Sequence, residues 1–271
     1  MRKLVSKLET MIPDAVRQFL LGSSAEPSRL ANGVHALLNH LPGERITSLP
    51  CGGILEGYRM KVDWSRHRSL VTGSWEPTVV DALVKVVQPG SCAVDAGAHI
   101  GFYTLLLAKL VGLQGKVFAF EPLPWNFGAL SENVHINNCT QVELINKALL
   151  DHACELQANV PGGEPLPGSV SFSTPNGSKH VRATAVALDD FLGDAEQPVQ
   201  FIKIDVEGAE SLVLKGASKA IEKNHPAMMI EVHHFDGSEP DDSPVIGQLQ
   251  GWGYQIQWLN RWKETSHLLV V

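Results

Sequence analysis

The chain has 271 residues, of which 44 % are hydrophobic and 19 % are charged. This length allows one large domain, or one domain with an appendage, and the hydrophobic content excludes a disordered or fibrous chain. The 29 acidic side chains outnumber the 22 basic ones and give a formal net charge of −7. Because nucleic-acid binding needs clustered Lys and Arg, no nucleic-acid partner is expected.

Membrane insertion and secretion are also disfavoured. A spanning helix needs ~20 nearly uncharged apolar residues, whereas the most apolar stretch, residues 102–113, is shorter and contains Lys109. The N-terminal segment carries Glu9 and Asp14 and no long apolar core, which predicts an amphipathic helix instead of a signal peptide. The four cysteines show neither a CxxC pair nor a zinc-type spacing, so a reducing, cytoplasmic location is expected.

Residues 1–75 are expected to form a helical and hairpin cap on a main domain that spans residues 76–271. Apolar residues at three- and four-residue spacings predict helices over residues 1–45. Alternating apolar and polar residues around a Glu-Gly pair predict a small hairpin over residues 50–64.

In the main domain, helices and short apolar strands are predicted to alternate. The predicted strands cover residues 91–97, 116–122, 142–149, 200–208, 227–233, 254–259 and 266–271. The predicted helices cover residues 78–87, 102–111, 124–138, 209–223 and 242–251. Apolar strands alternating with helices indicate an α/β fold, a parallel sheet with helices on both faces. Residues 152–184 interrupt this rhythm and predict an inserted hairpin or loop.

The first predicted strand of the main domain ends in VDAGAHIG, residues 94–101. This loop lacks the GxGxxG pattern of dinucleotide-binding folds, and Asp95 at the strand end would repel phosphate. The sequence also has no GxxxxGK[ST] motif, which excludes a P-loop nucleotide site. An acidic strand end followed by a glycine turn suits a cationic, phosphate-free adenosine compound, and S-adenosylmethionine (SAM) has that chemistry.

Glu121 ends the next predicted strand, 26 positions after Asp95. An acid at roughly ~20 residues beyond a glycine loop is placed to bind ribose hydroxyls. A helix cap at the strand end is the alternative interpretation of Glu121.

Four segments in this order resemble a known family: VDAGAHIGFYT, FAFEPLPWNF, TAVALDDFL and FIKIDVEGAE. With the preceding GSWEP, they resemble the FkbM family of SAM-dependent methyltransferases over Gly73 to His233. The resemblance implies a class I methyltransferase fold, a seven-stranded sheet whose last strand is antiparallel. It also implies O-methylation of a sugar or secondary-metabolite hydroxyl, with a small-molecule or glycan acceptor and S-adenosylhomocysteine (SAH) as product.

The resemblance further assigns binding roles to individual residues. Glu121 would bind the ribose, Asn126 the ribose or adenine side, and Lys147 and Ala148 would flank the adenine. The methionine part of SAM would be surrounded by Glu76, Asp95, Gly97, His99, Gly101 and Tyr103. His99 replaces the more common Asn of this loop.

Acidic side chains follow the predicted strand FIKIDVEG at alternate positions. Lys203, Asp205 and Glu207 would therefore share one face of the strand. The next strand adds Glu231 and His233 with the same alternation. Because crowded carboxylates raise each other's pKa, one of them can serve as a general base. We expect Asp205 and Glu207 to take the acceptor's hydroxyl proton, with His233 as the alternative base.

Several alternatives stay open at this point. The charged cluster could instead orient the turn after the strand, with Lys203 neutralising one carboxylate. Asp205, Glu207 and Glu231 could hold a divalent cation, although no metal is predicted. N-methylation of a small or peptidyl substrate, or SAM binding without turnover, would use the same fold. A homo-oligomer is possible.

Overall fold

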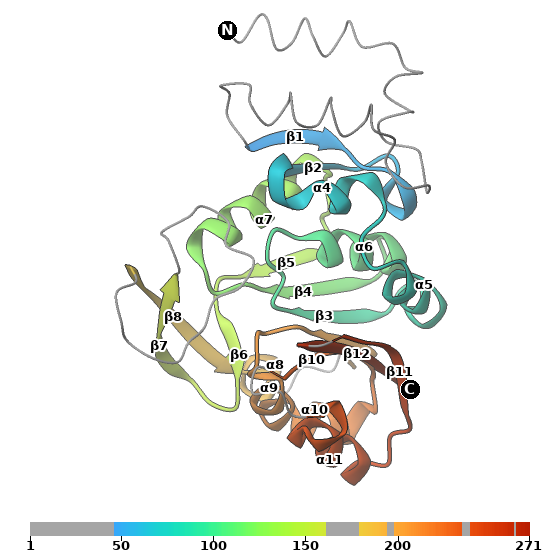
Figure 1. Cartoon of the computed structure of the whole chain (residues 1–271), viewed down its shortest axis with the longest axis vertical. Coiled ribbons are helices and arrows are strands. Elements are labelled where there is room, and N and C mark those ends of the chain that lie inside the picture. The colour runs from blue at the N-terminus through green and yellow to red at the C-terminus, as the bar shows by residue number, and fades with distance from the viewer. Residues whose placement is uncertain (1–45, 161–178, 194–197, 235–238, 263) are drawn as a thin grey trace, which may run out of the picture. The chain divides into compact units, whose positions relative to one another are not determined.

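The computed structural model describes residues 46–160, 179–193, 198–234, 239–262 and 264–271 (Figure 1). The chain divides into two compact units, Met1–Trp75 and Glu76–Val271. The helices predicted over residues 1–45 lie outside the described residues.

The described part of the first unit is built on an antiparallel pair of strands. Strand β1 (Ile46–Pro50) pairs with β2 (Arg59–Asp63), the 3-10 turn η1 (Gly53–Leu55) lies between them, and helix α4 (Trp64–Thr72) follows. The first strand therefore begins upstream of the predicted hairpin over residues 50–64.

A seven-stranded sheet forms the centre of the second unit, in the order β11-β12-β10-β9-β3-β4-β5. Neighbouring strands from β10 to β5 are parallel, whereas β12 runs antiparallel to both β10 and β11. This arrangement confirms the predicted mostly parallel sheet with an antiparallel last strand. The seven strands are β3 (Cys92–Ala96), β4 (Lys116–Phe120), β5 (Val142–Ile145), β9 (Phe201–Ile204), β10 (Ala227–His233), β11 (Ile256–Arg261) and β12 (Thr265–Val270).

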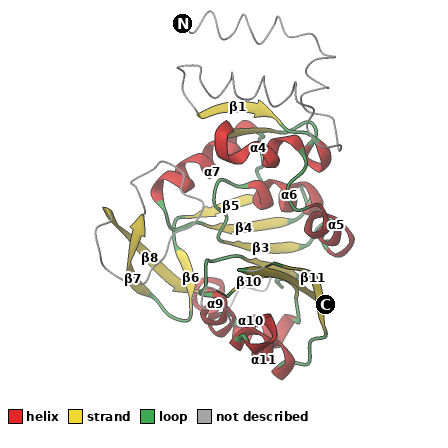
Figure 2. Ribbon diagram, in the orientation of Figure 1, coloured by secondary structure: helices red, strands yellow, loops and turns green. Residues whose placement is uncertain are grey.

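Helices cover both faces of this sheet (Figure 2). One face carries α5 (Pro77–Val86), α6 (Phe102–Val111) and α7 (Pro124–Ile136). The opposite face carries α8 (Leu188–Leu192), α9 (Glu210–Gly216), α10 (Ser218–Asn224) and α11 (Pro244–Gly251), the last preceded by the 3-10 turn η3 (Pro240–Asp242). Among the described residues, no helix is both long and apolar enough to cross a bilayer.

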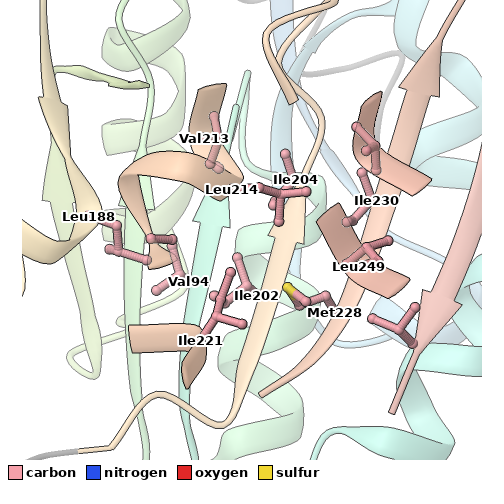
Figure 3. Packing of buried hydrophobic residues seen from close by; sticks show 14 of the residues in the cluster. Val94, Leu188, Ile202, Ile204, Val213, Leu214, Ile221, Met228, Ile230 and Leu249 are labelled. Atoms are coloured by element: carbon pink, nitrogen blue, oxygen red, sulfur yellow. The ribbon is translucent and has the colours of Figure 1, made fainter. Parts of the chain in front are cut away.

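A hydrophobic core lies between the sheet and helices α8 to α11 (Figure 3). Successive strand residues point to opposite faces, so every second residue of each strand enters this core. Strand residues Val94, Ile202, Ile204, Met228 and Ile230 pack there against helix residues Leu188, Val213, Leu214, Ile221 and Leu249. The intervening residues of the same strands point to the face that carries α5, α6 and α7, and the charged side chains of the candidate site are among them.

The predicted strand over residues 142–149 is wrong, because the chain breaks after Ile145. Strand β5 stays in the large sheet, while β6 (Ala148–Leu150) joins a three-stranded sheet of order β6-β8-β7. At the break, the Asn146 side chain donates a hydrogen bond to the carbonyl of Glu121 at 2.8 Å. In the second sheet, β7 (Cys154–Val160) and β8 (Lys179–Ala187) pair antiparallel.

The single helix predicted over residues 209–223 is also divided, into α9 and α10. Ala217 departs from helical geometry with φ −111° and ψ 8°. The neighbouring Gly216 lies against strand β6, where a Cβ atom would come within 2.0 Å of the Leu150 carbonyl oxygen. The close approach of β6 thus requires glycine at this position.

The substitution Gly216→Ala tests this packing. Replacing glycine by alanine inside a helix normally stabilises a protein by up to ~1 kcal/mol. At Gly216 we expect a loss of at least ~2 kcal/mol in the free energy of unfolding, because backbone atoms must move apart. Gly128→Ala in α7 is the matched control, since its Cβ would meet nothing within 4 Å. Equal effects of the two substitutions in urea denaturation would contradict the close approach.

Candidate active site

The loop between β3 and α6 lies directly against the end of β9. Gly97 has φ +78°, and a Cβ atom there would lie 1.8 Å from the carbonyl oxygen of Asp205. Gly101 has φ +97°, and its Cβ would meet the Leu130 side chain at 2.7 Å. Gly97 is therefore required by its packing against the backbone of Asp205, and Gly101 is favoured by its positive φ.

Glu121 connects this loop to the end of β4. Its carboxylate accepts the backbone N–H of His99 at 2.8 Å and that of Leu123 at 3.0 Å. Burial raises the pKa of Glu121 to about 7, against hydrogen bonds that lower it, one of them from Asn126. The Oδ1 atom of Asn126 is buried and has no hydrogen-bond partner among the described residues.

The remaining predicted adenine contacts lie just after β5. Lys147 is exposed, and the buried Ala148 begins β6. Asn146, which the sequence analysis did not select, bonds to the backbone of Glu121 and so holds this turn beside the β4 end. An asparagine within an apparent strand was the one signal that could have identified it.

Asp95 is fully buried, and its carboxylate contacts other protein groups. The Thr104 hydroxyl donates to one oxygen at 2.5 Å, and Lys203 Nζ lies 3.3 Å from the other. Asp95 and Lys203 are paired in register on the adjacent parallel strands β3 and β9. The strand register therefore accounts for this ion pair.

A second group of charged side chains surrounds His233 at the end of β10. His233 Nδ1 lies 2.9 Å from Glu210, and Nε2 lies 3.5 Å from Glu207 and 3.9 Å from Glu231. Burial alone lowers the pKa of His233, but these interactions, led by the hydrogen bond to Glu210, raise it to about 9. The side chain is therefore an imidazolium at neutral pH.

Glu207 does not continue the strand as the alternation predicted. Strand β9 ends at Ile204, and Glu207 has a left-handed backbone with φ 57°. Burial and the charge of Asp205 together raise the pKa of the Glu207 carboxyl to about 7, although the neighbouring His233 lowers it. The residue thus has a carboxyl group that titrates near neutrality at the end of the sheet.

His267 on β12 belongs to the same group, although it is not among the residues predicted from the sequence. Its Nε2 atom lies 3.3 Å from Glu231 and 3.4 Å from Glu76, and Asn260 Oδ1 lies 2.9 Å from Nδ1. The Tyr103 hydroxyl donates a hydrogen bond to Glu76. Glu231 and His267 face each other across the antiparallel pair β10 and β12. A histidine in an otherwise apolar final strand was the available signal.

Backbone strain is also concentrated here. Among the described residues, five that are not glycine have positive φ, and Glu76, His99 and Glu207 are three of them. Such conformations cost of order 1–3 kcal/mol and occur preferentially at functional sites. The site is therefore held in place by the surrounding structure.

Within the part of the chain that the structure describes, two groups of side chains have the spacing to hold a metal ion. The first comprises Glu76, Glu231 and His267, and the second comprises Asp205, Glu231 and His233. The second group overlaps the predicted Asp205, Glu207 and Glu231 set but contains His233 in place of Glu207. The imidazoles already form ion pairs with the carboxylates in both groups.

The residues present fit SAM. The unpartnered Asn126 Oδ1 and the adjacent Glu121 carboxylate are acceptors for adenosine N–H and O–H groups. The cluster at the β9 and β10 ends contains more carboxylates than cations, which suits a ligand with sulfonium and ammonium charges. These two sets lie at the carboxyl ends of parallel strands, where ligands bind in open α/β sheets.

The comparisons with known proteins agree with this chemistry. Residues 95–256 match the family described as the methyltransferase FkbM domain. The chain is 28 % identical over 192 residues to a hexuronic acid methyltransferase, AglP, of Haloferax volcanii, covering 69 % of this chain and 73 % of that protein. It is 25 % identical to 31-O-demethyl-FK506 methyltransferase FkbM of Streptomyces tacrolimicus, covering 63 % of this chain and 75 % of that protein.

Two further matches are partial. "Methyltransferase 1" of Beauveria bassiana is 30 % identical over 145 residues, so this chain spans 58 % of that relative's length. The crystal structure of methyltransferase FkbM from Methylobacillus flagellatus KT has a TM-score of 0.43 and 19 % identity, covering 78 % of this chain and 56 % of that chain.

The sheet order, the glycine loop and the acidic strand ends define a class I SAM-dependent methyltransferase domain. The family match covers more than half of the residues. The chain belongs to the FkbM methyltransferase family.

The raised pKa of His233 makes stability depend on pH. A histidine whose pKa rises from 6.5 to about 9 on folding stabilises the protein fully below pH 6.5, and this contribution is lost as pH rises through 9. We expect His233→Asn to lower the free energy of unfolding at about pH 6 much more than at about pH 9.5. Urea denaturation at both pH values measures the difference.

Ser131→Ala is the control. The Ser131 hydroxyl, which does not titrate in this range, donates a hydrogen bond to the Phe127 carbonyl at 2.8 Å, so its loss should cost the same at both pH values. An equal cost of His233→Asn at the two pH values would mean that the ion pairs with Glu207, Glu210 and Glu231 contribute nothing to folding.

Proposed function

We propose that this protein transfers the methyl group of SAM to a hydroxyl oxygen of a sugar or another hydroxylated small molecule. The observation that carries the proposal is the Glu207 carboxyl group, with its pKa near 7, beside the His233 imidazolium. The names of two relatives, a hexuronic acid methyltransferase and a 31-O-demethyl-FK506 methyltransferase, support a hydroxylated acceptor.

The cofactor would be held by the ends of β3, β4 and β5. Glu121 and Asn126 would accept hydrogen bonds from the adenosine, and the turn at Lys147 and Ala148 would flank the adenine. When bound, SAM supplies an electrophilic methyl group on a sulfonium. Glu76, with the loop that contains His99, would hold the methionine part. Alignment of methyl group and acceptor supplies much of the rate in such transfers.

Glu207 is the general base in this proposal. Its pKa of about 7 allows the carboxylate to form near neutral pH and still bind a proton strongly. The His233 imidazolium lies 3.5 Å away and is fixed on its other side by Glu210. Because His233 is already protonated at neutral pH, it would be a poor base. Its role in this proposal is to orient Glu207. Asp205, close to Lys203, would add negative charge near the sulfonium.

SAH binding tests the cofactor site. Glu121→Gln should weaken SAH affinity by about 5- to 150-fold, the ~1–3 kcal/mol expected when a charged hydrogen-bond acceptor is lost. Isothermal titration calorimetry on the folded variant measures this. Glu222 is an exposed acid on α10, and the variant Glu222→Gln should bind SAH like the wild type. Wild-type affinity in Glu121→Gln would remove Glu121 from the cofactor site.

The base assignment predicts the pH dependence of turnover. Wild-type kcat should rise with pH through about 7, as the Glu207 carboxyl ionises. Glu207→Gln should lower kcat by about 10²–10⁴-fold and abolish that rise, with little change in SAH affinity. Glu155→Gln on β7 is the control for an exposed acid. An unchanged pH profile in Glu207→Gln would assign the base elsewhere.

Single-turnover assays with labelled SAM decide between acceptor classes. A panel of uronic acids, neutral sugars and other alcohols should give methylated product, whereas matched amines should not. Product from amines alone would favour N-methylation, and SAH binding without any product would favour a binding module. We also propose a cytoplasmic location, supported by four free cysteines.

A further inference from the structure

We propose that Lys203 is a positioning residue that locks the cofactor loop between β3 and α6 onto the end of β9, so that SAM affinity depends on a lysine that does not touch SAM. The proposal rests on the proposed function only for the location of the cofactor site. It gives Lys203 a role beyond the one that the sequence suggested, which was to neutralise one carboxylate.

The contacts of Lys203 reach both sides of the junction. Its Nζ atom donates to the carbonyl of Gly97 at 2.8 Å and approaches that of Ala96 at 3.4 Å. It lies 3.3 Å from Asp95 and 3.4 Å from Asp205. One ammonium group therefore connects the strand before the loop, the loop itself and the segment after β9.

The burial of Lys203 makes this arrangement unusual. The residue is 1 % exposed, and lysine is almost never fully buried unless it is paired. Burial lowers the pKa of Lys203, but the charges of Asp205 and Asp95 raise it above its ordinary value. The ammonium therefore remains charged, and a fixed cation donates strong hydrogen bonds.

Gly97 in the loop allows these contacts to form. Gly97 lacks a Cβ, so its backbone can lie against the Asp205 carbonyl while its own carbonyl accepts from Lys203. The Tyr103 ring, 5.4 Å from Nζ, covers another side of the ammonium. Because His99 in the same loop donates its backbone N–H to Glu121, a shift at Gly97 would also displace the proposed ribose side of the site.

A merely neutralising role and a positioning role predict different results for a double substitution. Lys203→Met alone leaves the buried Asp95 carboxylate unpaired, which is strongly destabilising. Lys203→Met combined with Asp95→Asn removes both charges and should recover most of the lost stability. We expect SAH affinity in this double variant to stay at least about tenfold below wild type, because the Gly97 carbonyl has lost its donor.

The control pair is Lys116 and Glu143, an ion pair 2.7 Å long between strands β4 and β5. Lys116→Met with Glu143→Gln should leave SAH affinity unchanged. Urea denaturation, SAH titration and amide hydrogen exchange over residues 97–101 are measured for each variant. Faster exchange in this loop together with weak SAH binding in the Lys203 double variant supports positioning.

The proposal is overturned if the Lys203 double variant recovers both its stability and an SAH affinity within about threefold of wild type. Lys203 would then serve only to neutralise charge. If the double variant does not fold, the proposal is tested by following the NMR resonance of the Lys203 Nζ atom in the wild-type protein. This resonance should shift on SAH addition, and an unchanged resonance would overturn the proposal. Because SAH binding needs no acceptor, failure to methylate any hydroxyl would count against the proposed function alone.

Discussion

The site depends on the contact between the loop after β3 and the end of β9. Gly97 permits this contact, because any side chain would collide with the Asp205 carbonyl, and Lys203 closes it with hydrogen bonds to the loop. Every proposed SAM contact on the loop, and both acids that follow β9, are placed relative to this junction.

Parallel strands bring the rest of the chemistry to the same edge. The carboxyl ends of β3, β4, β9 and β10 lie side by side, so residues far apart in the chain become neighbours. Alternation then divides each strand: one set of side chains enters the core beneath α8 to α11, and the other set includes Asp95, Lys203 and Glu231 near the carboxyl ends of the strands. The hydrophobic core and the polar site are thus two faces of the same strands.

Charge explains why such a site tolerates so many acids. Six carboxylates, those of Glu76, Asp95, Asp205, Glu207, Glu210 and Glu231, surround Lys203, His233 and His267. Buried acids without partners would be costly, and each of these lies beside the side-chain nitrogen of Lys203, His233 or His267. The surplus of negative charge in the site remains available to a cationic cofactor. The net charge of −7 of the whole chain does not show where this surplus lies.

The sequence by itself determined the alternation of strands and helices and the family motifs, and it placed Glu121 and Asp205 at strand ends, because these features depend on local spacing. Tertiary structure alone decided the contacts that depend on register and close approach. It paired His267 with Glu231 across β12, and it buried Asp95 against Lys203. It also broke the predicted elements at Asn146 and Gly216, where another strand end or strand comes too close for regular structure to continue.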